Sequence, residues 1–116
     1  MSNRILDKPG KLDADEWAAM RRHPTWTLVI LQRIPAFAVL AEVAANHHEK
    51  LDGSGYGRGL TGADLTLPAR ILVVADIAEA LSADRPYRGA MEPDEVRAIM
   101  RRDAGTAFCR DTLGAL

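Results

Sequence analysis

Five of the nine glycines in this 116-residue chain fall within ten positions, from Gly53 to Gly62. Because glycine favours turns and weakens helices, this density predicts an irregular loop, which we place at residues 49–67. The sequence on both sides carries helix signals, whereas the alternating pattern of strands is nearly absent. The chain is therefore predicted to be all-α, with helical segments on either side of one long loop.

Caps and prolines mark where these helices begin. Asp13 and Glu16 have the spacing of a capping box, which predicts a helix that continues through Met20. Proline is well tolerated in the first turn of a helix, so prolines predict the later starts. The further segments are a helix after His23-Pro24, a helix over 37–45, one from Pro68 to about Ala83, one from Pro93 to about Asp103, and a short helical tail after Phe108. These signals amount to about five helices in a single domain spanning 1–116.

Composition limits the classes of protein to consider. Fifteen basic and sixteen acidic side chains give a formal charge of -1, which argues against binding a nucleic-acid polymer through bulk electrostatics. Cys109 is the single cysteine, so no intrachain disulfide can form and we expect a reducing, cytoplasmic location. The longest apolar run, 71–75, is far below the ~20 residues of a membrane span, so we expect no membrane association.

Asp76 stands inside an apolar segment, Ile71 to Ala78, that predicts a helix buried on almost every side. A carboxylate in such surroundings must be paired, hydrogen-bonded, metal-bound or protonated, because an isolated buried charge is very costly. Asp76 is thus a candidate metal ligand. The alternative is a structural ion pair with Arg70 or a more distant arginine.

His47 and His48 precede the glycine-rich loop directly. Adjacent residues on a helix point about 100° apart, so both can face one centre only if the helix ends there or if two metals share the site. A histidine is also commonly a structural residue, and His23 could simply cap the end of the first helix. All three histidines are nevertheless candidate metal ligands.

Arg85 and Arg88 bracket a short turn just beyond the Asp76 segment. Guanidinium groups grip phosphate oxygens bidentately, so the pair is a candidate phosphate site, with a solvated surface turn as the alternative. Together with the histidines and Asp76, these arginines favour metal-assisted hydrolysis of a phosphoester. Mixed histidine and carboxylate ligands suit iron, manganese or zinc better than magnesium.

The sequence also resembles a known family, the HD-GYP phosphodiesterases of the HD superfamily. The resemblance rests on several separated motifs in the family's order and covers nearly the whole chain. The matching stretches are His47 to Tyr56 (HHEKLDGSGY), Leu67 to Asp76 (LPARILVVAD), Asp84 to Arg88 (DRPYR), Ile5 to Leu12 (ILDKPGKL) and Met20 to Pro24 (MRRHP).

This resemblance implies an HD-domain-like helical bundle that hydrolyses cyclic di-GMP to pGpG or GMP in bacterial signalling. It also implies two or three divalent metal ions, commonly iron or manganese. By resemblance, four residues fall at metal-ligand positions: His23, His47, His48 and Asp76. The same comparison places Arg85 and Arg88 at the substrate phosphates and Tyr56 beside the bound nucleotide.

Two positions depart from the family pattern. The Gly-Tyr-Pro triplet reads Gly55-Tyr56-Gly57 here, which removes the rigidity of proline and predicts a looser loop. Thr27 stands where the family usually has glycine. In addition, the family's His-Asp dyad would lie upstream of Ile5, so no catalytic residue is assigned and we expect a truncated domain with about half of the metal ligands.

Three hypotheses follow from these observations. The first is an HD-GYP phosphodiesterase domain present as a fragment, and the second is an inactive remnant that binds nucleotides or proteins. The third is an HD-type hydrolase that acts on another phosphoester. We also expect exposed apolar surface, self-association, and an upstream or partner signalling domain.

Overall fold

The computed structural model describes residues 3–85 and 88–116, so the expectations for Pro86 and Tyr87 lie outside the described residues. Helices and loops make up this described part, which contains no strand beyond two isolated bridges. In order along the chain, the helices are α1 (Asn3–Leu6), α2 (Ala14–Met20), α3 (His23–Gln32), a 3-10 helix η1 (Pro35–Leu40), α4 (Ala41–Ala45), α5 (Leu67–Ser82), α6 (Pro93–Arg102) and α7 (Arg110–Gly114). The prediction of an all-α fold with one long loop is confirmed.

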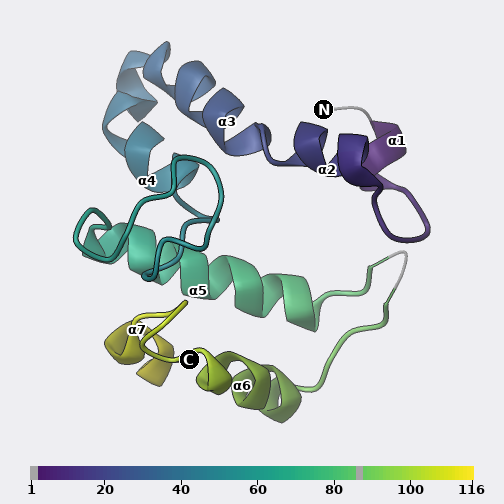
Figure 1. Cartoon of the computed structure of the whole chain (residues 1–116). Coiled ribbons are helices and arrows are strands. Elements are labelled where there is room, and N and C mark those ends of the chain that lie inside the picture. The colour runs from purple at the N-terminus through teal and green to yellow at the C-terminus, as the bar shows by residue number, and fades with distance from the viewer. Residues whose placement is uncertain (1–2, 86–87) are drawn as a thin grey trace.

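Helix α5 lies in the middle of the molecule (Figure 1). Helix α4 contacts it on one side, and α6 and α7 contact it on the other. Helix α3 packs along α4 and η1 and so forms the outer part of the first side. The glycine-rich loop runs from α4 back across to the start of α5.

The predicted helix starts agree with the structure. Asp13 and Glu16 form the capping box of α2, each side chain accepting a hydrogen bond from the other residue's backbone N–H. Proline occupies the first turn of α3, α5 and α6. Because these positions need no intrahelical donor, the local sequence alone fixes where the helices begin.

The segment 37–45 differs from the single helix that was expected there. It consists of the 3-10 helix η1 followed by the short helix α4. Ile34, before Pro35, is extended (φ -107°, ψ 106°), as residues that precede proline prefer. The chain therefore enters η1 through a bend, and tight 3-10 turns of this kind are frequent at the start of an α-helix.

The main hydrophobic core lies in the C-terminal half. It joins α5, α6, α7 and the loop before α7 through Val73, Val74, Ala78, Val96, Met100, Ala107, Phe108 and Leu113. Met100 has no exposed surface and belongs to the largest fully buried side chains. This core holds α5 in place and thereby supports the residues on its opposite side.

The N-terminal half leaves apolar side chains exposed. From α3 to the end of η1, the exposed ones are Trp26, Ile30, Ile34, Phe37, Val39 and Leu40. Helix α5 also exposes a stripe at Leu67, Ile71 and Ala75, so the expectation that it is buried on almost every side is wrong for one face. An apolar helix is buried only where other elements pack against it. None of the described residues covers the face of α5 that carries Leu67, Ile71 and Ala75.

The glycine-rich loop folds back onto Glu49, whose side chain is completely buried. One carboxylate oxygen accepts the N–H of Arg58 at 2.5 Å, and the other accepts the N–H of Leu60 at 2.9 Å. The Arg58 guanidinium then bonds Asn46 Oδ1 at 2.8 Å and pairs with Glu42. The Glu49 side chain thus connects the loop to the turn that carries the histidines.

Arg70 fastens the far end of the same loop. Its Nε donates to the carbonyl oxygen of Leu65 at 2.9 Å, and a terminal nitrogen donates to the carbonyl oxygen of Gly62. Arg70 is therefore engaged with the loop rather than with Asp76, which removes the structural ion pair considered for these two residues.

Within the part of the chain that is described, no helix combines the length and the apolar character that crossing a membrane requires.

We predict that Met100→Ala lowers the free energy of unfolding by about 2–5 kcal/mol, because the removed side chain leaves a cavity in a closed core. Urea denaturation followed by circular dichroism measures the change. Met91→Ala is the matched control, since Met91 packs only at the edge of the core, and its loss should be clearly smaller. Equal losses would contradict the position of this core.

We predict that Glu49→Gln releases the glycine-rich loop. A glutamine amide presents one oxygen, so one of the two backbone N–H groups loses its acceptor, at a cost of about 1–3 kcal/mol. Faster hydrogen exchange at Arg58 and Leu60 would report it. Glu42→Gln makes the same chemical change at an exposed carboxylate and should leave both amides protected.

Candidate functional site: a histidine cluster beneath the glycine-rich loop

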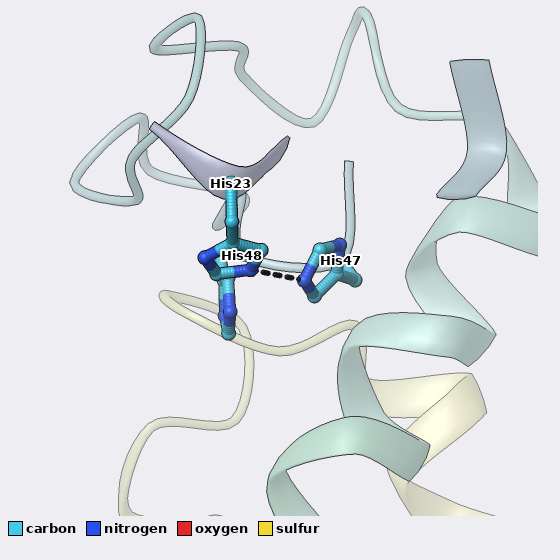
Figure 2. A group of neighbouring side chains, drawn as sticks. All are labelled: His23, His47 and His48. Carbon is cyan, nitrogen blue, oxygen red and sulfur yellow. Dashed lines mark hydrogen bonds between the residues drawn. The ribbon is translucent and has the colours of Figure 1, made fainter. Parts of the chain in front are cut away.

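Three histidine side chains converge between α3 and the end of α4 (Figure 2). His23 is the first residue of α3, and His47 and His48 lie in the turn that follows α4. One potential ligand nitrogen from each lies within 4.8 Å of those of the other two. Because α4 ends at Ala45, the backbone turns between the two adjacent histidines, and both side chains reach one centre.

The ring nitrogens of His23 and His47 oppose each other. Their Nε2 atoms are 2.8 Å apart. Nδ1 of His23 lies 2.8 Å from the carbonyl oxygen of Met20, and Nδ1 of His47 lies 2.6 Å from that of Ala44. A carbonyl oxygen only accepts hydrogen bonds, so both Nδ1 atoms carry protons, and in the neutral rings both Nε2 atoms hold lone pairs. Two facing lone pairs require a proton or a cation between them.

Two of the three histidines, His23 and His48, are held in the state that a metal needs. Burial, together with the neighbouring rings of His47 and His23, lowers the pKa of His48 to about 3. Burial also lowers the pKa of His23, although its hydrogen bond to Met20 opposes the shift. His23 does cap the carbonyl end of α2, but burial outweighs the helix end, so the cationic form is not favoured. Neutral imidazoles are the form in which histidine binds metals.

Asp76 adds a carboxylate beside this cluster. Its Oδ2 lies 3.7 Å from Nδ1 of His48, and its side chain is 35% exposed. The expectation of a fully buried carboxylate is therefore wrong, since Asp76 lies on the less covered side of α5. Asp76 faces the histidines nonetheless, and the donors fit a metal ion: three imidazoles with an oxygen ligand at the edge.

Tyr56 covers the cluster from the glycine-rich loop. Its ring stacks on that of His48 with centroids 4.5 Å apart, and its backbone N–H donates to the His48 carbonyl at 3.0 Å. Burial raises the pKa of Tyr56 to about 12, with the negative charge of Asp76 as a second cause, so the phenol stays neutral. Tyr56 therefore lies next to the candidate metal ligands, and its place beside a bound nucleotide stays a prediction.

Glycines allow the loop to come this close. A Cβ on Gly55 would lie within 2.6 Å of Glu49 Cα and Lys50 N, so a side chain cannot fit there. Gly57 has φ +128°, and a Cβ on it would approach Glu49 Oε1 to 2.9 Å. Proline holds φ near about -65°, so proline in place of Gly57 is incompatible with this loop path. The loop is bonded at several points, although loss of proline predicted a looser one.

The two arginines of the predicted phosphate site are engaged elsewhere. Arg88 donates to the carbonyl oxygens of Ala80, Leu81 and Gly89, which caps the end of α5. Arg85 pairs with Glu79 at 2.8 Å. The structure therefore gives both arginines roles at the end of α5 and does not bring them into the histidine cluster.

Sequence reasoning missed two features of the site. It quoted Glu49 within a motif but gave it no role, although a glutamate that directly follows two ligand candidates and precedes five glycines could have been considered as a loop anchor. It also missed Trp17 and Arg21, whose spacing of four residues on one helix signals a side-chain pair.

Thr27, which stands where the family usually has glycine, contacts the first histidine. Its hydroxyl donates to the His23 carbonyl at 3.0 Å, and a glycine could not make this contact.

Comparison with known proteins gives consistent similarities. The family model described as HD domain matches residues 3–111. The 3′3′-cGAMP-specific phosphodiesterase 3 of Vibrio cholerae serotype O1 is 50% identical over 116 residues, which is 100% of this chain and 25% of that protein. The cyclic di-GMP phosphodiesterase response regulator RpfG of Xanthomonas campestris pv. campestris is 41% identical over 114 residues, 94% of this chain and 30% of the relative.

A third relative comes from another bacterium. The cyclic di-GMP phosphodiesterase of Thermotoga maritima is 40% identical over 95 residues, 80% of this chain and 26% of that protein. The chain thus spans about a quarter of the length of the curated relatives it matches. With a family model that matches nearly the whole chain, and with the His-His-Glu motif and glycine-rich loop in their expected places, this chain belongs to the HD domain family and is of the HD-GYP type.

Proposed function

We propose that this chain contributes to a metal-dependent phosphodiesterase that hydrolyses a cyclic purine dinucleotide. The observation that carries the proposal is the facing pair of Nε2 atoms in His23 and His47, 2.8 Å apart, because a cation relieves the repulsion of their lone pairs. In this proposal residues 1–116 act as one partial HD-GYP domain, with residues 49–67 as its functional loop.

The proposed metal ligands are His23, His47, His48 and Asp76. The HD-GYP resemblance favours iron or manganese, and three imidazoles with a carboxylate suit either ion. A bound metal would polarise the phosphodiester and activate water. The chain's own residues hold the ligands in place: the Met20 and Ala44 carbonyls orient two rings, and Tyr56 shields a third from solvent.

Two cyclic dinucleotides are candidate substrates. The sequence resemblance favours cyclic di-GMP, and two of the relatives described above are named as cyclic di-GMP phosphodiesterases. The relative with 50% identity is named as specific for 3′3′-cGAMP, which makes this dinucleotide the second candidate. Both contain 3′–5′ phosphodiester linkages, so the same reaction would open either ring.

A binding module without turnover is the alternative function, and one observation favours it. Within the described residues, the three histidines are the one group of His, Cys, Asp and Glu side chains close enough together to hold a metal. Three or four ligands suit one metal ion, whereas the family resemblance implies two or three metal ions. A chain that binds one metal and a dinucleotide without cleaving it would fit this alternative.

The proposal also includes partners. The exposed apolar side chains of α3 and η1 support self-association or contact with a signalling domain, as expected from the sequence. We also propose a location in the reducing cytoplasm, which the single cysteine favours.

We predict that the chain purified from manganese- or iron-supplemented cells contains about one metal ion, since one cluster of three or four ligands holds one ion. His47→Ala should remove most of it, and Asp76→Ala should lower the affinity. Elemental analysis of dialysed protein measures the content. Unchanged metal in Asp76→Ala would show that Asp76 is structural, and Asp103→Ala, far along the chain and outside the cluster, is the control.

We predict that the metal-loaded chain converts cyclic di-GMP or 3′3′-cGAMP to linear dinucleotide or mononucleotides, which chromatography separates. His47→Ala should abolish turnover because it removes a proposed ligand. Binding of either dinucleotide without any linear product would overturn the enzymatic proposal for this chain and would support the binding module.

A further inference from the structure

Arg21 lies within cation–π distance of two aromatic rings beside the histidine cluster. Its guanidinium carbon is 5.8 Å from the centre of the Trp17 ring and 6.0 Å from the centre of the Tyr56 ring. Trp17 stands four residues earlier on the same face of α2, and Tyr56 comes from the glycine-rich loop. Two elements that are far apart in the sequence thus hold one cationic side chain.

The charge of Arg21 has no acidic partner in the described part of the chain. Among the described residues, the ion pairs near α2 join Lys8 to Asp13 and Glu16, and none includes Arg21. Cation–π contacts use the flat face of the guanidinium and leave its five N–H donors free. Other arginines are occupied instead, since Arg85 pairs with Glu79 and Arg88 caps α5.

Tyr56 links the Arg21 guanidinium to the histidine cluster. Tyr56, which contacts Arg21 on one side, stacks on His48 at 4.5 Å and meets His23 edge-on at 6.2 Å. Arg21 is also only two residues before His23. A group held by the histidine cluster would therefore have an exposed, preoriented guanidinium next to it.

We infer that Arg21 forms a phosphate-binding subsite beside the histidine cluster, with Trp17 and Tyr56 as the rings that orient its guanidinium. The inference rests on the proposed function for its natural ligand, a phosphate group of a cyclic dinucleotide. Guanidinium donors match phosphate oxygens bidentately, and a residue already held near two rings loses little conformational freedom on binding. Arg21 thereby supplies the phosphate contact for which the sequence suggested Arg85 and Arg88.

Trp17 offers a direct way to observe this subsite. The chain has two tryptophans, Trp17 and Trp26, and Trp26 is exposed on α3. The Trp26→Phe variant therefore leaves Trp17 as the single indole, next to Arg21. We predict a saturable change in its fluorescence when the metal-loaded variant is titrated with cyclic di-GMP, 3′3′-cGAMP or inorganic phosphate.

Arg21→Gln in this background should weaken the binding of each responding ligand about tenfold or more, as expected for a lost charge-assisted hydrogen bond. Arg22→Gln is the matched control, because it removes the same charge from the adjacent, exposed residue, whose side chain caps no helix. Its effect should stay below about twofold. Metal content and melting temperature are measured for both variants, and neither should change.

Equal weakening by Arg21→Gln and Arg22→Gln would overturn the subsite, because it would show a general effect of charge. The absence of any saturable Trp17 response, to inorganic phosphate as well as to both dinucleotides, would overturn it too. Arg21-dependent binding without hydrolysis supports the subsite and counts against the enzymatic proposal alone. The two proposals can therefore fail separately.

Discussion

The buried carboxylate of Glu49 is the interaction on which the site depends. Its two oxygens accept the N–H groups of Arg58 and Leu60 in the glycine-rich loop. A buried carboxylate without partners would be costly, so these two hydrogen bonds favour the closed position of the loop over Glu49. Because His47 and His48 directly precede Glu49, the same contact that satisfies the charge brings Tyr56 onto His48. The closed loop and the stacking of Tyr56 on His48 thus depend on the same contact.

The histidine cluster shows how burial and local hydrogen bonds cooperate. Backbone carbonyls at the ends of two helices orient His23 and His47, and burial keeps the pKa values of His23 and His48 low. Helix ends have free carbonyl groups that need donors, so the same contacts complete α2 and α4. The fold therefore gains hydrogen bonds at its helix ends while it directs lone pairs toward one point.

Local signals made the helices predictable, whereas long-range contacts decided the details. Proline and the Asp13 capping box placed helix starts correctly, because these rules act within one turn. The convergence of His47 and His48 was also foreseeable, because the apolar helix before them was expected to end where the glycine-rich loop begins. The exposed stripe on α5 was not, because it depends on which helices reach that face. Arg85 and Arg88 looked free in the sequence, but most of their partners lie six to eight residues earlier, around the end of α5.

Gly57 adopts a backbone conformation that proline cannot adopt. Its φ of +128° is closed to proline, and the atom that a side chain would meet belongs to Glu49. A Gly-Tyr-Pro triplet could not follow this path by a change at residue 57 alone, because the backbone would have to change together with the residue. The glycine is therefore matched to the path of this loop, and its presence says little by itself about activity.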